Sequence, residues 1–305
     1  MRFLIFLFCL PFFIYNSLAQ ETSAQNFLKS GIVKAKLGDY QAAILDINEA
    51  IRIDSSLGEA YYNRGIIYTE MKKYPDAIQD FNAAIRLNPS QPEPYFNKAF
   101  TEDLSGDYEH AILDYSRAIL LRPAYPEEYH NRGLVKFDMG DFKEAQMDFT
   151  RAIQYNPDFA EALYNRGLCK FNLEDFQGSI QDFSDAIRMD QTQGDYYGSR
   201  GAAKAATGFY QEAILDFSYG ISLQPSDINL RSNKALANIY LGQYQEALDE
   251  YTRVIGLDPS KTEAWANRGL AHHYLGNDNE ACSDWKKASS MGSLKADNLL
   301  LKFCR

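Results

Sequence analysis

The sequence has little of the chemistry that catalytic and metal sites use. Its 305 residues include only four histidines, four cysteines and two tryptophans. It contains no His-Glu-x-x-His motif, no paired-cysteine metal motif, no phosphate-binding glycine loop and no nucleophile elbow. We therefore expect a chain that is not an enzyme and that uses neither a cofactor nor a metal.

Positive charge is also scarce. The chain has 41 acidic and 31 basic residues, which gives a formal net charge of -10. A chain this acidic is repelled by phosphate backbones. We therefore expect no nucleic-acid partner.

Long apolar runs are missing after the first residues. Residues 3–15 are almost entirely apolar, Arg2 precedes them, and Ser17 and Ala19 place small side chains where a signal peptidase reads. This pattern predicts a signal peptide over residues 1–19, cleaved after Ala19, and hence a secreted or periplasmic protein. No later run reaches about 18 apolar residues, so we expect no membrane span in the mature chain.

The main positive signal is a repeat of 34 residues. Asn-Arg-Gly begins at Asn63, Asn131, Asn165 and Asn267, and every separation is a multiple of 34. Two further series keep the same spacing: Ala43, Ala77, Ala111, Ala145, Ser179, Ala213, Ala247 and Ala281, and Phe81, Tyr115, Phe149, Phe183, Phe217, Tyr251 and Trp285. These series predict eight units: 24–57, 58–91, 92–125, 126–159, 160–193, 194–227, 228–261 and 262–295.

Each unit has the pattern of two helices. In the second unit, residues 60–71 suit a helix, and Pro75 then stands where the first turn of another helix tolerates proline. Residues 76–87 carry apolar side chains at helical spacing, and Pro89 ends the second helix. Glycines at the end of the first helix in other units predict a left-handed turn there: Gly106, Gly140, Gly208, Gly242 and Gly276.

These residues resemble the tetratricopeptide repeat, and the resemblance covers residues 24–295. The signature positions in the second unit are Gly65, Tyr68, Tyr74, Ala77, Phe81, Ala84 and Pro89. The resemblance implies an all-α fold, a right-handed α-solenoid (superhelix) of stacked antiparallel helix pairs whose first helices line a concave groove. It also implies close helix contacts at the small residues Gly65, Ala77 and Ala84.

A further helix is expected after the last unit, because the final hairpin otherwise leaves its stacking face in water. Leu294 to Phe303 has the pattern of this helix. The resulting organisation is a signal peptide (1–19), a solenoid (20–295) and a C-terminal capping helix (296–305). Cys282 and Cys304 are either a disulfide that joins the cap to the last hairpin or two buried thiols.

An asparagine series is the first candidate site. Its members recur at one position of the first helices: Asn63, Asn97, Asn131, Asn165, Asn233 and Asn267. In the tetratricopeptide family, asparagines at this position face the groove, and a carboxamide both donates and accepts hydrogen bonds. These residues are predicted to bind the backbone of an extended peptide, or else to make contacts within the hairpin stack.

Aromatic side chains beside this series are the second candidate. Phe96, Phe100, Phe137, Tyr164 and Phe171 return to one helix face. Helical periodicity makes packing the default interpretation, and an aromatic patch inside the groove is the alternative.

Charged residues follow the period as well. A cation on the first helix recurs with an anion on the second, which predicts an ion pair that joins the two helices: Arg64, Lys98, Arg132, Arg166, Arg200, Lys234 and Arg268 with Asp80, Asp114, Asp148, Asp182, Asp216, Glu250 and Asp284. Four further lysines stand where the family often has tyrosine, and we expect their ammonium groups to reach water: Lys34, Lys136, Lys170 and Lys204.

The sequence thus predicts a non-catalytic scaffold outside the cytoplasm that binds a protein or an extended peptide in its groove. Two alternatives stay open: a structural subunit of an envelope assembly, and an accessory protein that binds glycan or cell wall. Neither the partner nor the oligomeric state follows from the sequence.

Overall fold

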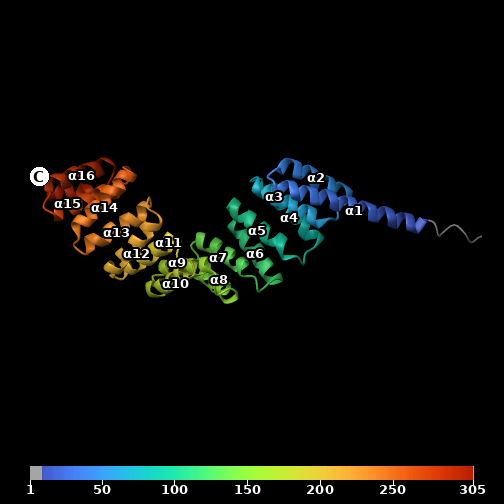
Figure 1. Ribbon diagram of the computed structural model, residues 1–305, viewed down its shortest axis with the longest axis horizontal. Coiled ribbons are helices and arrows are strands. Elements are labelled where there is room, and N and C mark those ends of the chain that lie inside the picture. Colours follow the sequence, from blue (N-terminus) through green and yellow to red (C-terminus); the bar gives the residue numbers. More distant parts are fainter. Residues whose placement is uncertain (1–8, 305) are drawn as a thin grey trace, which may run out of the picture. The chain divides into compact units, whose positions relative to one another are not determined.

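The computed structural model describes residues 9–304, so residues 1–8 of the expected signal peptide and Arg305 of the expected cap lie outside it. This part of the chain consists of helices joined by short turns, without strands. The helices divide into two compact units, and the boundary in the sequence lies between Tyr155 and Asn156. The expected all-α solenoid of stacked helix pairs is confirmed (Figure 1).

The first unit contains four helix pairs. Its helices are α1 (Cys9–Lys36), α2 (Tyr40–Ile53), α3 (Gly58–Glu70), α4 (Tyr74–Leu87), α5 (Pro92–Ser105), α6 (Tyr108–Leu121), α7 (Pro126–Asp138) and α8 (Phe142–Tyr155). Each first helix packs against its own second helix, and within the unit α2, α4 and α6 each pack against the next first helix.

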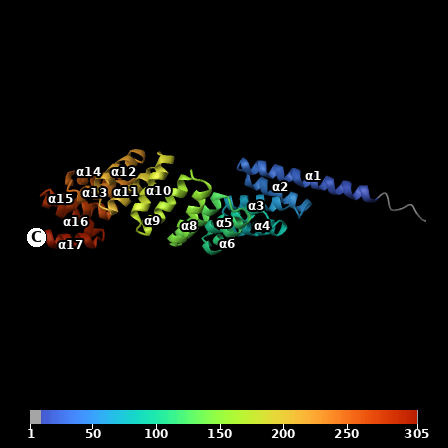
Figure 2. The same ribbon diagram turned by 90° about the horizontal axis from the view of Figure 1, so that it is seen from below.

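The second unit repeats this arrangement and adds one helix. Its helices are α9 (Ala160–Asn172), α10 (Phe176–Met189), α11 (Gly194–Ala206), α12 (Tyr210–Leu223), α13 (Ile228–Tyr240), α14 (Tyr244–Leu257), α15 (Thr262–Tyr274), α16 (Asp278–Ser290) and α17 (Leu294–Phe303). The last helix, α17, lies against α16 as the sequence predicts for a cap (Figure 2).

The turn inside each pair follows from local backbone chemistry. Gly106 and Gly140 have φ values of 82° and 84°, in the left-handed region that glycine enters without a steric penalty. Two pairs make the same turn without glycine, at Lys72 (φ 58°) and Glu174 (φ 61°). Lys72 and Glu174 thus adopt the left-handed conformation although their side chains disfavour it, because the packing of the two helices in each hairpin requires the turn.

The small residues are required by close contact between the helices. A Cβ atom added at Gly65 would lie 2.8 Å from Cε1 of Phe81, closer than carbon atoms approach. Ala77 and Ala84 are buried where the second helix meets its neighbours. The packing role expected of all three residues is confirmed.

The first helix begins earlier than the first predicted unit. Helix α1 starts at Cys9, fifteen residues before position 24, and extends well beyond its partner α2 (Figure 1). Residues 12–30 contain neither proline nor glycine, so nothing in this stretch ends the helix.

Candidate functional site on the inner face

The first helices form one face of each unit, which we call the inner face. Within a unit each first helix contacts the next one, as α1 does α3 and α11 does α13. Among the described helices, successive second helices make no comparable contact. Each unit therefore curves toward its first helices. The predicted asparagine series lies on these helices.

Two asparagines of the first unit donate hydrogen bonds from their amide nitrogen to other groups of the chain. Nδ2 of Asn63 donates to the backbone oxygen of Glu59 at 2.8 Å. Nδ2 of Asn97 donates to the backbone oxygen of Glu93 and to the hydroxyl of Tyr62, both at 3.0 Å. The contact with Tyr62 links α5 to α3, so Asn97 also has the stacking role that the sequence left open.

The remaining members of the series differ in their surroundings. Oδ1 of Asn267 accepts a hydrogen bond from Nζ of Lys295 at 2.7 Å and thus joins α15 to the start of α17. Asn131 and Asn165 are half-buried, whereas Asn233 on α13 is exposed. Within the described residues, the carboxamide of Asn233 makes no hydrogen bond.

The predicted aromatic patch is mostly engaged in packing. The rings of Phe96 and Tyr115 meet edge to face with centroids 5.6 Å apart. Tyr164 stacks on Tyr196 at 4.7 Å, and its hydroxyl lies 3.2 Å from Oγ of Ser199.

The same holds for the other two half-buried rings. Phe137 meets Phe142 edge to face at 5.2 Å, and Phe171 meets Phe176 at 5.3 Å. Of the five predicted aromatic residues, Phe100 is the exposed one, with 40% of its surface accessible. Use of these residues as ligand anchors stays a prediction.

Two cavities open on the inner face, at equivalent places in the two units. The first, of about 230 Å³, lies between α1 and α3 and is lined by Ile32, Ala35, Lys36, Tyr40, Asn63, Ile66, Ile67 and Glu70. The second, of about 370 Å³, lies between α11 and α13 and is lined by Ala202, Ala205, Ala206, Tyr210, Phe217, Asn233, Leu236, Ala237 and Tyr240. Each residue of the first cavity has a counterpart in the second, 170 residues later.

Sequence reasoning did not find these cavities, although the sequence contains a signal for them. Ala35 and Ala205 occupy the position that Phe137 and Phe171 occupy in two other hairpins. A methyl group at this position leaves a space that a phenyl ring fills elsewhere. Each cavity also includes an asparagine of the predicted series, so an apolar space and a carboxamide lie together.

The ion pairs predicted between the two helices of a hairpin are confirmed in all seven hairpins. In the α7–α8 hairpin, Nη2 and Nε of Arg132 lie 2.6 and 2.9 Å from the two carboxylate oxygens of Asp148. The same pairing recurs as Arg64–Asp80, Lys98–Asp114, Arg166–Asp182, Arg200–Asp216, Lys234–Glu250 and Arg268–Asp284. These side chains are mostly buried and join the helices, so they are not free to bind a ligand.

The expectation that four further lysines reach water is wrong for Lys136, Lys170 and Lys204, whose side chains are at most 21% exposed, whereas the side chain of Lys34 is 38% exposed. Nζ of Lys136 lies 2.6 Å from Oδ2 of Asp148, and Lys170 and Lys204 contact Asp182 and Asp216 at 2.7 Å. Lys34 pairs with Asp46 in the first hairpin. Each lysine therefore adds a cation to the carboxylate of its own hairpin, where the two charges attract each other at contact distance.

The α5–α6 hairpin reverses this charge pattern. Glu102 stands where α7 has Lys136, so Lys98 is shared between Asp114 at 2.7 Å and Glu102 at 3.4 Å. Only 3% of the surface of Glu102 is exposed, and its Oε2 has no hydrogen-bond partner in the described part of the chain. Burial raises the pKa of the Glu102 carboxyl to about 7.

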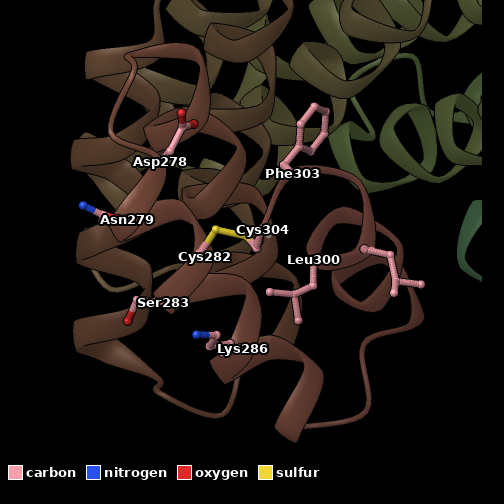
Figure 3. A pocket seen from close by; sticks show the side chains of 9 residues that line it. Asp278, Asn279, Cys282, Ser283, Lys286, Leu300, Phe303 and Cys304 are labelled. Carbon is pink, nitrogen blue, oxygen red and sulfur yellow. A yellow bond between two sulfur atoms is a disulfide. The ribbon is translucent and has the colours of Figure 1, made fainter.

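A larger cavity, of about 740 Å³, lies between α16 and α17 (Figure 3). A disulfide joins Cys282 on α16 to Cys304 at the end of α17, with their Cα atoms 5.8 Å apart. The disulfide forms one wall of the cavity, and Leu300 and Phe303 of α17 lie on the same side as Cys304. Of the two alternatives that the sequence left open, the structure has the disulfide.

Comparison with known proteins agrees with the hairpin geometry. Models of the tetratricopeptide repeat match residues 24–57, 58–91 and 130–196, and a further model, described as TPR repeat, matches residues 104–140 and 237–276. The chain belongs to the tetratricopeptide repeat family. No curated protein sequence matches this tetratricopeptide repeat chain.

Solved structures show the same fold at low sequence identity. A tetratricopeptide repeat protein from Parabacteroides merdae is 23% identical with a TM-score of 0.60, and the match covers 81% of this chain and 99% of that one. The C-terminal part of a TPR repeat-containing protein from Cytophaga hutchinsonii is 18% identical with a TM-score of 0.64, over 78% and 98% of the two chains. YrrB, described as a TPR protein with an unusual peptide-binding site, is 20% identical with a TM-score of 0.55, over 61% and 96%.

None of the described helices combines the length and the apolar character that crossing a membrane requires. Among the described residues, no three or more histidine, cysteine, aspartate or glutamate side chains are grouped so that they could hold a metal ion.

Proposed function

We propose that this protein is a non-catalytic scaffold that binds an extended segment of another protein along its inner face. The observation that carries the proposal is the pairing of a carboxamide with an apolar cavity, at Asn63 and again at Asn233. A carboxamide pairs with a peptide unit, and an apolar cavity accepts a side chain. Binding in a chain of this family also accords with YrrB, whose description names a peptide-binding site.

The setting proposed for this activity is outside the cytoplasm. Residues 1–19 are proposed to be a signal peptide, so that the mature chain starts at Gln20 and continues as eight repeats and a cap. The support is the sequence: the apolar run over residues 3–15 and the small residues Ser17 and Ala19. Intact-mass measurement of the protein recovered from the extracytoplasmic fraction tests this directly, because a mature chain that retains residues 1–19 contradicts it.

The binding proposal is tested by capture of a partner from the extracytoplasmic fraction. The mature chain is compared with a variant in which Asn63 and Asn233, the asparagines that line the two cavities, are replaced by Ala. We expect the mature chain to retain a partner that the variant loses, while the melting temperatures of the two stay within a few degrees.

A matched control removes amides from the second helices instead. Gln79, Gln177 and Gln211 are exposed and make no hydrogen bond within the described residues, so their replacement by Ala should leave capture unchanged. Equal retention by all three proteins would place the partner away from the inner face. Such a result would favour the envelope-assembly alternative, and retention of polysaccharide alone would favour the glycan alternative.

A further inference from the structure

We infer that the cavity around Asn233 is a subsite for a phenylalanine-like side chain of the bound segment. This inference rests on the proposed function, because it assigns a side-chain preference to the surface that would bind the segment. Three features of the chain support it: the ring that fills the same space in another hairpin, the residues that line the cavity, and the aromatic and amide groups at its opening.

The chain itself shows which group the space accepts. Phe171 on α9 is the counterpart of Ala205 on α11, and Phe176 is the counterpart of Tyr210. The Phe171 ring packs edge to face on the Phe176 ring with centroids 5.3 Å apart. Around Asn233 the equivalent ring is absent because Ala205 has only a methyl group, while Tyr210 still provides the aromatic wall. A phenyl ring supplied by a ligand would add the ring that Phe171 supplies in its own hairpin, beside the existing stack of Tyr210 on Tyr240.

The lining around Asn233 is uncharged and combines apolar with polar surface. The floor consists of the methyl groups of Ala202, Ala205, Ala206 and Ala237 together with the Phe217 ring. No carboxylate, ammonium or guanidinium group lines the cavity. A charged side chain would lose its hydration there without gaining a partner, whereas a phenyl ring gains apolar contact.

The rim adds aromatic and amide groups. The rings of Tyr210 and Tyr240 are stacked with centroids 4.8 Å apart, which closes one side of the opening. Asn233 is exposed beside it with an unused donor and acceptor. The side chain of a ligand can therefore enter the cavity while the peptide unit next to it pairs with the carboxamide of Asn233.

The other inner-face cavity differs in its chemistry. Around Asn63, the space is about 230 Å³ rather than about 370 Å³, and Lys36 and Glu70 stand among the lining residues. The exposed lining around Asn63 is the more apolar of the two, but the smaller space accommodates an aromatic ring less readily. The inference is therefore restricted to the cavity of the second unit.

The test uses small probes that carry one side chain between two peptide units. N-acetyl-L-phenylalanine methylamide is compared with the corresponding alanine and aspartate compounds in titrations of the mature chain with ¹³C-labelled alanine methyl groups. We expect the phenylalanine probe, at millimolar concentration, to shift the methyl signals of Ala202, Ala205, Ala206 and Ala237. The alanine and aspartate probes should leave them in place.

Three variants locate the effect. Ala205→Phe fills the cavity with the ring that Phe171 supplies in its own hairpin, and should abolish the shifts. The matched control Gln211→Phe adds the same ring at an exposed position of the same hairpin, and should retain them. Asn233→Ala should weaken binding of the phenylalanine probe about fivefold, the value of one hydrogen bond.

The result that overturns the inference is obtained on the wild-type chain and needs no variant to fold. It is a set of alanine methyl signals that respond equally to all three probes or to none. Such a result would leave the capture experiment intact, because the carboxamides of Asn63 and Asn233 can pair with a peptide backbone even when no side chain enters the cavity. Conversely, a phenylalanine-specific shift without asparagine-dependent capture would contradict the proposed function and keep the subsite.

Discussion

The α5–α6 and α7–α8 hairpins of the first unit have the same backbone plan and opposite charge balances. In α7–α8 two cations, Arg132 and Lys136, share the carboxylate of Asp148. In α5–α6 one cation, Lys98, is shared by the carboxylates of Asp114 and Glu102. One substitution in the repeat, lysine to glutamate, thus converts an excess of positive charge into an excess of negative charge. Hairpins that look equivalent by their period therefore differ in how they respond to mutation and to pH.

The largest loss of stability is expected when the α5–α6 hairpin loses Lys98, the cation shared by its two carboxyl groups. Lys98→Met leaves the carboxyl groups of Asp114 and Glu102 without the cation that they share, and we expect a loss of about 3 kcal/mol in the local stability of α5–α6. Native-state hydrogen exchange of the α5 and α6 amides measures this quantity without assuming that the whole array unfolds at once. Unchanged exchange would show that water already solvates both carboxylates.

A smaller loss of stability is expected in the α7–α8 hairpin, where two cations contact Asp148. Arg132→Met removes a bidentate partner of Asp148, but Lys136 still neutralises the carboxylate, so the expected cost is about 2 kcal/mol. The same exchange measurement on α7 and α8 applies, together with the melting temperature. If Arg132→Met costs more than Lys98→Met, the number of cations does not control stability in these hairpins.

The third prediction concerns pH. The pKa of Glu102 is raised to about 7 in the folded chain from an ordinary value of 4.5. The folded state therefore holds this proton more tightly, and the stabilisation is complete below pH 4.5 and disappears as the pH rises through 7. Glu102→Gln removes this dependence and should gain roughly 1–2 kcal/mol relative to the wild type between pH 5 and pH 8.

Urea unfolding of the wild type and of Glu102→Gln, repeated across this pH range, measures the difference. Lys136→Gln serves as the control, because it changes the equivalent position of the other hairpin and should show no such divergence near pH 7. Parallel pH profiles for wild type and Glu102→Gln would contradict the assignment of the raised pKa to this carboxyl.

The smallest effect is expected for the second cation of α7–α8. Lys136→Met leaves the bidentate contact between Arg132 and Asp148 in place, so we expect a cost of about 1 kcal/mol. Hydrogen exchange of α7 and α8 can resolve this difference from the effect of Arg132→Met. Equal costs for the two variants would mean that Lys136 is as important as the arginine, despite its single contact.

Most of the fold could be predicted because the repeat fixes it. A spacing of 34 residues, a glycine against the ring of Phe81 and a left-handed turn at Gly106 each specify a local geometry. The ion pairs followed from the same logic, since a cation and an anion recur together in each hairpin. The early start of α1 at Cys9 could not be derived from the period, because the residues before position 24 do not belong to it.

The site was predictable only in part. The period shows that Asn233 and Asn63 are equivalent, but their hydrogen bonds depend on neighbours that vary from hairpin to hairpin. The contacts of Lys136 were missed because the reach of a lysine ammonium to a carboxylate on the other helix is a three-dimensional property. Likewise, an alanine at position 205 is visible in the sequence, but only packing shows that its small size leaves a cavity.

The disulfide between Cys282 and Cys304 also affects the order in which the array comes apart. Linear arrays of hairpins fray from their ends, because a terminal hairpin has a neighbour on one side only. Here the cap is tied to the last hairpin by a covalent bond that closes a segment spanning 22 positions of the chain. Under oxidising conditions α16 and α17 therefore melt as one piece, and the C-terminal end loses the independent first step of unfolding that an open end would have.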